Sequence, residues 1–84
     1  MSKKLYVGNL SFSVDDQTLA DAFSQYGTVA SAKVITDRDT GRSKGFAFVE
    51  MSTVDEAQTS ISKLNGSQFE GRAMNVSEAK PQAP

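Results

Sequence analysis

The sequence contains no cysteine, no histidine and no tryptophan. Zinc sites, thiol catalysis and histidine-based proton transfer are therefore excluded, and we expect neither a metal nor any other cofactor. Small secreted domains often depend on disulfides, so a chain without cysteine suits a reducing compartment, and we predict a cytoplasmic location. No apolar run is long enough to cross a membrane, and the N-terminal residues lack the apolar segment of a signal peptide.

An excess of charge of either sign is also missing, because nine basic and ten acidic residues leave a net charge of −1. The distribution of the charges is more informative than their sum. The segments predicted below to be strands and loops carry eight of the nine basic residues, whereas the two predicted helices carry five carboxylates: Asp15, Asp16, Asp21, Asp55 and Glu56. A basic binding face and an ordinary solvated surface both fit this pattern.

The 84 residues are enough for one domain with a modest core. Period-two alternation predicts strands at about 4–8 and within 28–36, 44–51 and 72–79, and helical spacing predicts helices within 13–27 and 53–66. Asp15 is a candidate N-cap of the first helix, and Thr53 with Glu56 forms a capping box at the second. The charged, turn-rich segment 37–43 makes a hairpin of the second and third strands.

The order β-α-β-β-α-β predicts an α+β, ferredoxin-like sandwich. Two helices cover one face of a four-stranded antiparallel sheet with strand order 4-1-3-2. We expect this domain to span residues 3–80, followed by a flexible tail at 81–84. The predicted core takes Leu5, Val7, Ala32, Val34, Ala47, Val49, Met51, Met74 and Val76 from the sheet, and Leu19, Phe23, Ile61 and Leu64 from the helices.

Three aromatic residues are left on the face without helices, namely Tyr6, Phe46 and Phe48. The strand order makes their two strands central neighbours, so the rings should cluster in the middle of that face. A platform on which unpaired bases stack is one interpretation, with Lys4, Lys33, Arg42 and Lys44 meeting phosphates. A packing cluster beneath the C-terminal tail, or a dimer contact, is the alternative.

The stretches "LYVGNL" (5–10) and "KGFAFVEM" (44–51) resemble the paired hexamer and octamer signatures of the RNA recognition motif. Seven of the eight octamer positions match, and the exception, Met51, is expected to face the core. The resemblance extends over residues 3–80. It is nearest to the short single-domain members found in bacteria and to the domains of plant glycine-rich RNA-binding proteins.

This resemblance implies a domain that binds single-stranded RNA, as a post-transcriptional regulator or an RNA-chaperone-like accessory factor. We expect it to be a monomer, although the sequence does not determine the oligomeric state. It implies that Tyr6 and Phe48 stack on successive bases, that Phe46 packs against the sugars between them, and that Lys44 pairs with a phosphate. Further contacts implied by the resemblance are phosphates at Lys4 and Lys33, a clamp by Arg38 and Arg42, and base edges at Asn75, Ser77 and the backbone leading to Lys80.

Three alternatives stay open. Single-stranded DNA is one, because stacking does not distinguish the sugars. Acylphosphatases share a similar topology, but their phosphate cradle needs an arginine in the loop after the first strand, and "GNLSFSVDD" has none, so we expect no enzyme. A protein partner on the acidic helical face is the third.

Overall fold

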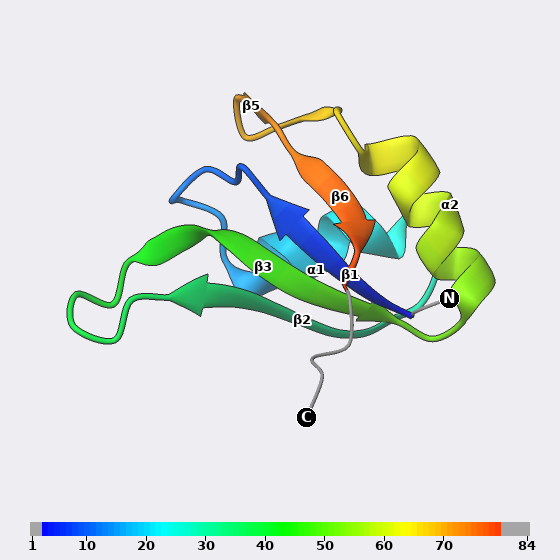
Figure 1. The fold of residues 1–84 in the computed structure, drawn as a ribbon, viewed down its shortest axis with the longest axis horizontal. Coiled ribbons are helices and arrows are strands. Elements are labelled where there is room, and N and C mark those ends of the chain that lie inside the picture. The colour runs from blue at the N-terminus through cyan, green and yellow to red at the C-terminus, as the bar shows by residue number, and fades with distance from the viewer. Residues whose placement is uncertain (1–2, 80–84) are drawn as a thin grey trace.

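The structure is a computed structural model that describes residues 3–79, so the predicted tail at 81–84 and the candidate Lys80 lie outside the described residues. Figure 1 shows a sheet in front of two helices. The elements in chain order are β1 (Lys4–Gly8), α1 (Asp16–Ser24), β2 (Val29–Thr36), β3 (Ser43–Met51), α2 (Val54–Leu64), β4 (Gln68–Phe69), β5 (Arg72–Ala73) and β6 (Asn75–Glu78).

The main sheet has the strand order β2-β3-β1-β6, and all its neighbours are antiparallel. The predicted first, second and third strands are β1, β2 and β3, and the predicted fourth strand is β6. Read from the β6 edge, the observed order is therefore the predicted 4-1-3-2, and the predicted fold is confirmed. The register places Tyr6 beside Phe48 on β3 and beside Ser77 on β6. Both helices lie on one side of the sheet (Figure 1), and the side without helices is called the open face below.

The core fills the space between the sheet and the two helices. Its largest fully buried side chains include Phe23 and Leu19 from α1 and Leu5, Val7 and Val49 from the central strands. The predicted core is confirmed, except that Ala32 and Ile61 are only partly buried. The structure adds Leu10 and Val14, which lie between β1 and α1, where neither period applies.

Both helices begin at the predicted caps. The Asp15 carboxylate accepts a hydrogen bond from the Thr18 amide (2.8 Å), and this bond holds the pKa of Asp15 below its ordinary value. At α2, the Glu56 amide donates to the Thr53 hydroxyl (3.1 Å) while the Glu56 carboxylate accepts from that hydroxyl (3.0 Å). The predicted pair therefore caps the second helix, although the carboxylate bonds to the hydroxyl of Thr53.

The chain after α2 departs from the prediction of a loop followed by one long strand. Residues 68–69 and 72–73 form a two-stranded hairpin of their own, and only Asn75–Glu78 joins the main sheet. The hairpin turns at Glu70 and Gly71, whose φ angles of 52° and 84° are typical of a tight primed turn. Reciprocal backbone bonds between Met74 and the segment 66–67 then separate the hairpin from β6.

None of the helices within the described residues is long and apolar enough to cross a membrane. Across residues 3–79, no group of three or more acidic side chains is arranged to hold a metal ion.

Candidate nucleic-acid interface

Tyr6, Phe46 and Phe48 gather in the middle of the open face, and they are called the ring cluster below. The ring centroids lie 5.9 Å (Tyr6–Phe46), 5.9 Å (Tyr6–Phe48) and 6.3 Å (Phe46–Phe48) apart. These are ordinary distances for tilted and edge-to-face aromatic pairs. Tyr6 is 36% exposed, and the phenylalanines are half-buried because the three rings shield one another without any helix above them.

The Tyr6 ring lies across the backbone of Gly8, two residues further along the same face of β1. A Cβ atom at position 8 would lie only 2.8 Å from the Tyr6 hydroxyl oxygen and 2.9 Å from a ring carbon. The missing side chain of Gly8 therefore gives the ring its place on the sheet. The ring is 36% exposed, so part of its surface is accessible from the open face.

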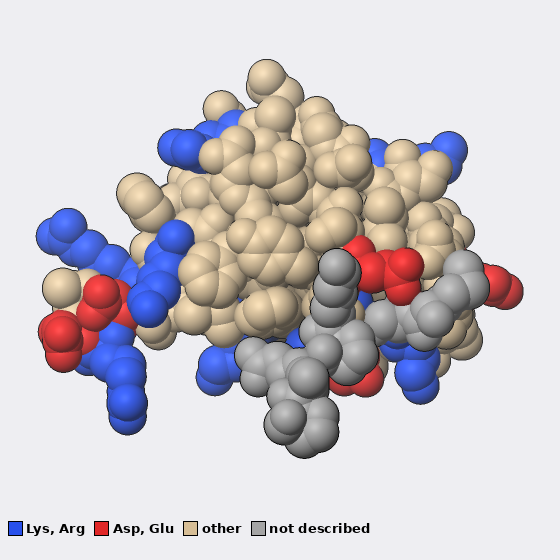
Figure 2. Space-filling model, in the orientation of Figure 1, with Lys and Arg blue, Asp and Glu red and all other residues tan. Residues whose placement is uncertain are grey.

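Three of the predicted lysines flank the ring cluster. The Lys4 ammonium nitrogen lies 5.0 Å from the Phe48 ring centroid, in cation–π geometry. Lys33 is paired with Phe48 across β2 and β3, and Lys44 lines a hollow together with Tyr6 and Phe46. Figure 2 shows an uncharged centre on the visible part of this face, with both basic and acidic side chains around it.

The two predicted loop arginines are not brought to the rings. Arg38 and Arg42 are exposed on the turn between β2 and β3, which projects beyond the rest of the sheet (Figure 1). Backbone bonds from Asp37 to Arg42 (2.7 Å) and from Gly41 to Asp37 (2.8 Å) close this turn. Because Asp37 and Asp39 share the turn, its basic charge is offset locally.

The edge strand β6 carries the predicted base-reading side chains. Ser77 is paired with Tyr6 and Asn75 with Gly8, and both side chains are exposed. Both therefore stand at the border of the ring cluster. Glu50, the acidic residue of the face, is paired in register with Lys4.

The sequence reasoning missed three residues beside the ring cluster. A hollow of about 280 Å³ lies at one end of the rings and is called the end hollow below; it is lined by Tyr6, Asn9, Leu10, Phe12, Lys44, Gly45, Phe46 and Arg72. Phe12 is 71% exposed, the most exposed large apolar side chain among residues 3–79. The one sign in the sequence that Phe12 belongs to the site is that it fits neither the strand period nor the helix period. Asn9 and Arg72 show no such sign in the sequence.

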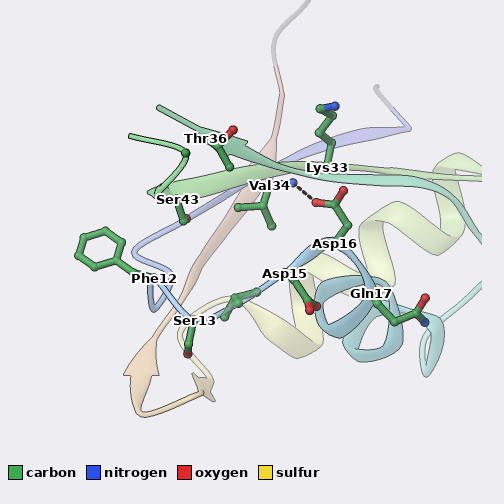
Figure 3. Close-up of a pocket in the computed structure, with 11 residues that line it drawn as sticks. Phe12, Ser13, Asp15, Asp16, Gln17, Lys33, Val34, Thr36 and Ser43 are labelled. Atoms are coloured by element: carbon green, nitrogen blue, oxygen red, sulfur yellow. Dashed lines mark hydrogen bonds between the residues drawn. The ribbon is translucent and has the colours of Figure 1, made fainter. Parts of the chain in front are cut away.

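A second hollow, of about 570 Å³, lies between the start of α1 and the ends of β2 and β3 (Figure 3). The Asp16 carboxylate in its wall accepts a hydrogen bond from the Val34 amide (2.7 Å), drawn as a dashed line. Asp15 caps α1, and Asp21 accepts from the Gln17 amide group (2.9 Å). With Glu56 bonded to Thr53, four of the five acidic helix residues accept hydrogen bonds from donors inside the domain, so each of these four has a structural role.

Comparisons with known proteins agree with this geometry. The family model described as RNA recognition motif matches residues 5–75. The 29 kDa chloroplastic ribonucleoprotein of Arabidopsis thaliana is 52% identical over 81 residues, which are 96% of this chain and 24% of that protein. The mitochondrial glycine-rich RNA-binding protein 2 of the same plant is 46% identical over 100% of this chain and 54% of its own length. The crystal structure of RNA Binding Protein PG1 superposes with a TM-score of 0.91 at 46% identity, covering 99% of this chain and 100% of that one.

The chain thus spans between about a quarter and about half of the length of these two curated relatives. The names of both relatives place them in organelles, and this contradicts the predicted cytoplasmic location. The prediction was wrong because an absence of cysteine indicates only that disulfides are not needed. It does not distinguish the cytoplasm from the interior of a chloroplast or a mitochondrion.

Proposed function

The chain belongs to the RNA recognition motif family, and from this membership we propose that its open face binds single-stranded RNA by stacking bases on Tyr6 and Phe48. Phe46 packs against the sugars between the two bases. Lys44, Lys4 and Lys33 contact phosphates, while Asn75 and Ser77 meet base edges along β6. The names of the two plant relatives, a ribonucleoprotein and an RNA-binding protein, support RNA as the partner.

The observation that carries the proposal is the ring cluster on a sheet face without helices. Large apolar side chains in such a position add little to the core, which is complete on the other side of the sheet. An unpaired base stacked on an aromatic ring contributes roughly 1–3 kcal/mol, whichever base it is. Two such rings side by side suit a flexible single strand, because bases held in a duplex cannot reach them.

The binding should be weak and tolerant of sequence, with a dissociation constant on the order of micromolar. Stacking does not read base identity, and few side chains are placed to do so. Such binding suits an accessory factor that holds RNA single-stranded, in a chaperone-like or post-transcriptional regulatory role. A strand-annealing assay with and without the protein tests that role separately from binding.

The experiment for the proposed function is a fluorescence titration of a labelled hexanucleotide of mixed sequence. Phe48→Ala should weaken binding by roughly 1–3 kcal/mol, whereas Phe48→Tyr, which keeps a π-face, should bind like the unaltered protein. Lys63→Ala, on α2, is the control for a change remote from the open face. If Phe48→Ala binds as tightly as Phe48→Tyr, the rings do not stack bases. A DNA strand of the same sequence measures the contribution of the 2′-hydroxyl groups.

A further inference from the structure

We propose that the end hollow is a subsite for one additional nucleotide of the same RNA strand, with Phe12 as its stacking ring and Arg72 and Lys44 as its phosphate contacts. This inference rests on the proposed function of the ring cluster. It adds a binding position next to the ring cluster, in which Phe12 on the loop after β1 and Arg72 on the β4–β5 hairpin join Lys44 of the second signature stretch.

The exposed Phe12 ring is held in place by the backbone around it. The Leu10 amide donates to the Gly45 carbonyl oxygen (2.8 Å), so the loop after β1 continues alongside the start of β3. Gly45 has a φ of 87°, and a Cβ atom there would lie 3.4 Å from a Phe12 ring carbon. The ring therefore rests on a position that has no side chain. Since Phe12 is 71% exposed, most of its surface still faces solvent and is available to a base.

Arg72 is oriented toward the same hollow by a partner far away in the sequence. One of its guanidinium nitrogens donates to the side-chain oxygen of Asn9 (2.8 Å), and the amide nitrogen of Asn9 donates to the Ala73 carbonyl oxygen (2.7 Å). Asn9 thus ties the hairpin to the end of β1 and fixes the arginine. A guanidinium group has five N–H donors, so this bond leaves most of them for phosphate oxygens.

The residues that line the end hollow favour a nucleotide as its ligand. Its lining residues include two cations, two rings of the ring cluster and Phe12, but no carboxylate. A base fits the aromatic surfaces, and a phosphate fits the cations. Because Tyr6 and Phe46 line the hollow as well as belonging to the ring cluster, a strand stacked on Tyr6 leads directly into it. The volume of about 280 Å³ is slightly below the range of pockets for drug-sized ligands, which suits a single base rather than a larger molecule.

A length series of RNA tests the subsite, with a dinucleotide and a hexanucleotide titrated separately. Phe12→Ala should weaken hexanucleotide binding by at least about fivefold and leave dinucleotide binding unchanged, because two bases occupy only Tyr6 and Phe48. Arg72→Gln should show the same dependence on length. Phe48→Ala should weaken both ligands. Lys63→Ala removes the same charge as Arg72→Gln but lies on α2, and it should weaken neither.

The outcomes separate the two proposals. If the unaltered protein binds neither ligand, or if Phe48→Ala has no effect, the proposed function fails. If Phe48→Ala weakens both ligands while Phe12→Ala and Arg72→Gln bind the hexanucleotide normally, the proposed function stands and the subsite is wrong. An equal loss for both lengths in Phe12→Ala also contradicts the subsite, because the ring would then act through the ring cluster. Circular dichroism of each variant confirms that its fold is retained.

Discussion

At the scale of the residue, the absence of a side chain at Gly8 determines where the Tyr6 ring lies, and it should therefore affect RNA binding. The phenol ring occupies the space that any side chain at position 8 would need. In this contact, the end of the Tyr6 side chain can move more easily than the β1 backbone. A methyl group added at position 8 should therefore displace the ring rather than the strand. The orientation of Tyr6, and not only its presence, is therefore under the control of Gly8.

Gly8→Ala should accordingly weaken RNA binding while leaving the fold intact. The displaced Tyr6 ring loses part of its stacking energy, so we expect a loss smaller than the roughly 1–3 kcal/mol of Tyr6→Ala. Titration of single-stranded RNA and thermal melting measure the two effects. In a Tyr6→Ala background, Gly8→Ala should cause no further loss, because no ring remains to be displaced. An additional loss in the double variant would show that Gly8 acts independently of Tyr6.

Phe48 and Val49 are adjacent in sequence but lie on opposite faces of β3. Val49 is 0% exposed in the core, so Val49→Ala should lower the free energy of unfolding by roughly 1–2 kcal/mol and leave the RNA affinity of the folded protein unchanged. Phe48→Ala should show the opposite pattern, with little effect on stability and a clear loss of affinity. Urea denaturation and RNA titration of both variants provide the comparison. An exchange of the two results would mean that the faces of the strand are assigned backwards.

The sequence predicted the ring cluster but not the end hollow, for a physical reason. Tyr6, Phe46 and Phe48 follow a period of two on strands whose neighbours are set by topology. Asn9 and Arg72, in contrast, are 63 residues apart and meet only because a short hairpin folds back toward the end of β1. No local pattern encodes that contact. The positions of the loop arginines, Arg38 and Arg42, likewise depend on the geometry of a turn and not on a period.

At the scale of the element, the start of α2 is tied to the rest of the domain through Glu56. Its carboxylate accepts hydrogen bonds from the Thr53 and Ser52 hydroxyls and from the Thr28 amide, the last at 2.8 Å. The Ser52 bond, followed by those from Thr28 and Thr53, holds the pKa of Glu56 below the ordinary glutamate value of 4.5. The helix start is thereby connected to the segment before β2.

This lowered pKa sets the pH dependence of the contribution from Glu56. A group whose pKa is lower in the folded state binds protons more weakly there than in the unfolded state. Its contribution to stability is therefore complete above the ordinary value of 4.5 and is lost as the pH falls through the folded value. Glu56→Gln should be less stable than the unaltered protein at neutral pH, and the difference should narrow in acid. Urea titrations at several pH values measure this, and a difference that stays constant with pH would contradict it.

The elements themselves were largely predictable, and the exceptions are short. The main strands and both helices were found because each is long enough to show a period and each helix carries its own cap. The β4–β5 hairpin was missed because a two-residue strand has no period to detect. It forms because Glu70 and Gly71 adopt the left-handed conformation that a tight turn requires.

At the scale of the whole molecule, the net charge of −1 conceals a separation of charge between layers. Four helix carboxylates bond within the domain, while Lys4, Lys33 and Lys44 flank the ring cluster. The basic character of the open face is nevertheless modest. Glu50 is paired with Lys4 in register, and Asp37 and Asp39 lie on the same turn as the two arginines. Long-range attraction of RNA should therefore be weak.

The salt dependence of binding should reflect this balance. Each phosphate neutralised on a single strand contributes about 0.7 to the slope of log affinity against log salt concentration, so two or three phosphate contacts give a slope of about −1.4 to −2.1. Lys44→Ala should make the slope shallower by about 0.7, whereas Phe48→Ala should lower the affinity at every salt concentration without changing the slope, because a ring releases no counterions. Lys63→Ala, on the helical side, should change neither quantity. Titrations over a range of potassium chloride concentrations measure all four proteins. A much steeper slope in the unaltered protein would mean that charges rather than rings hold the RNA on the open face. A slope that responds to Phe48 and not to Lys44 would mean that Lys44 does not contact a phosphate.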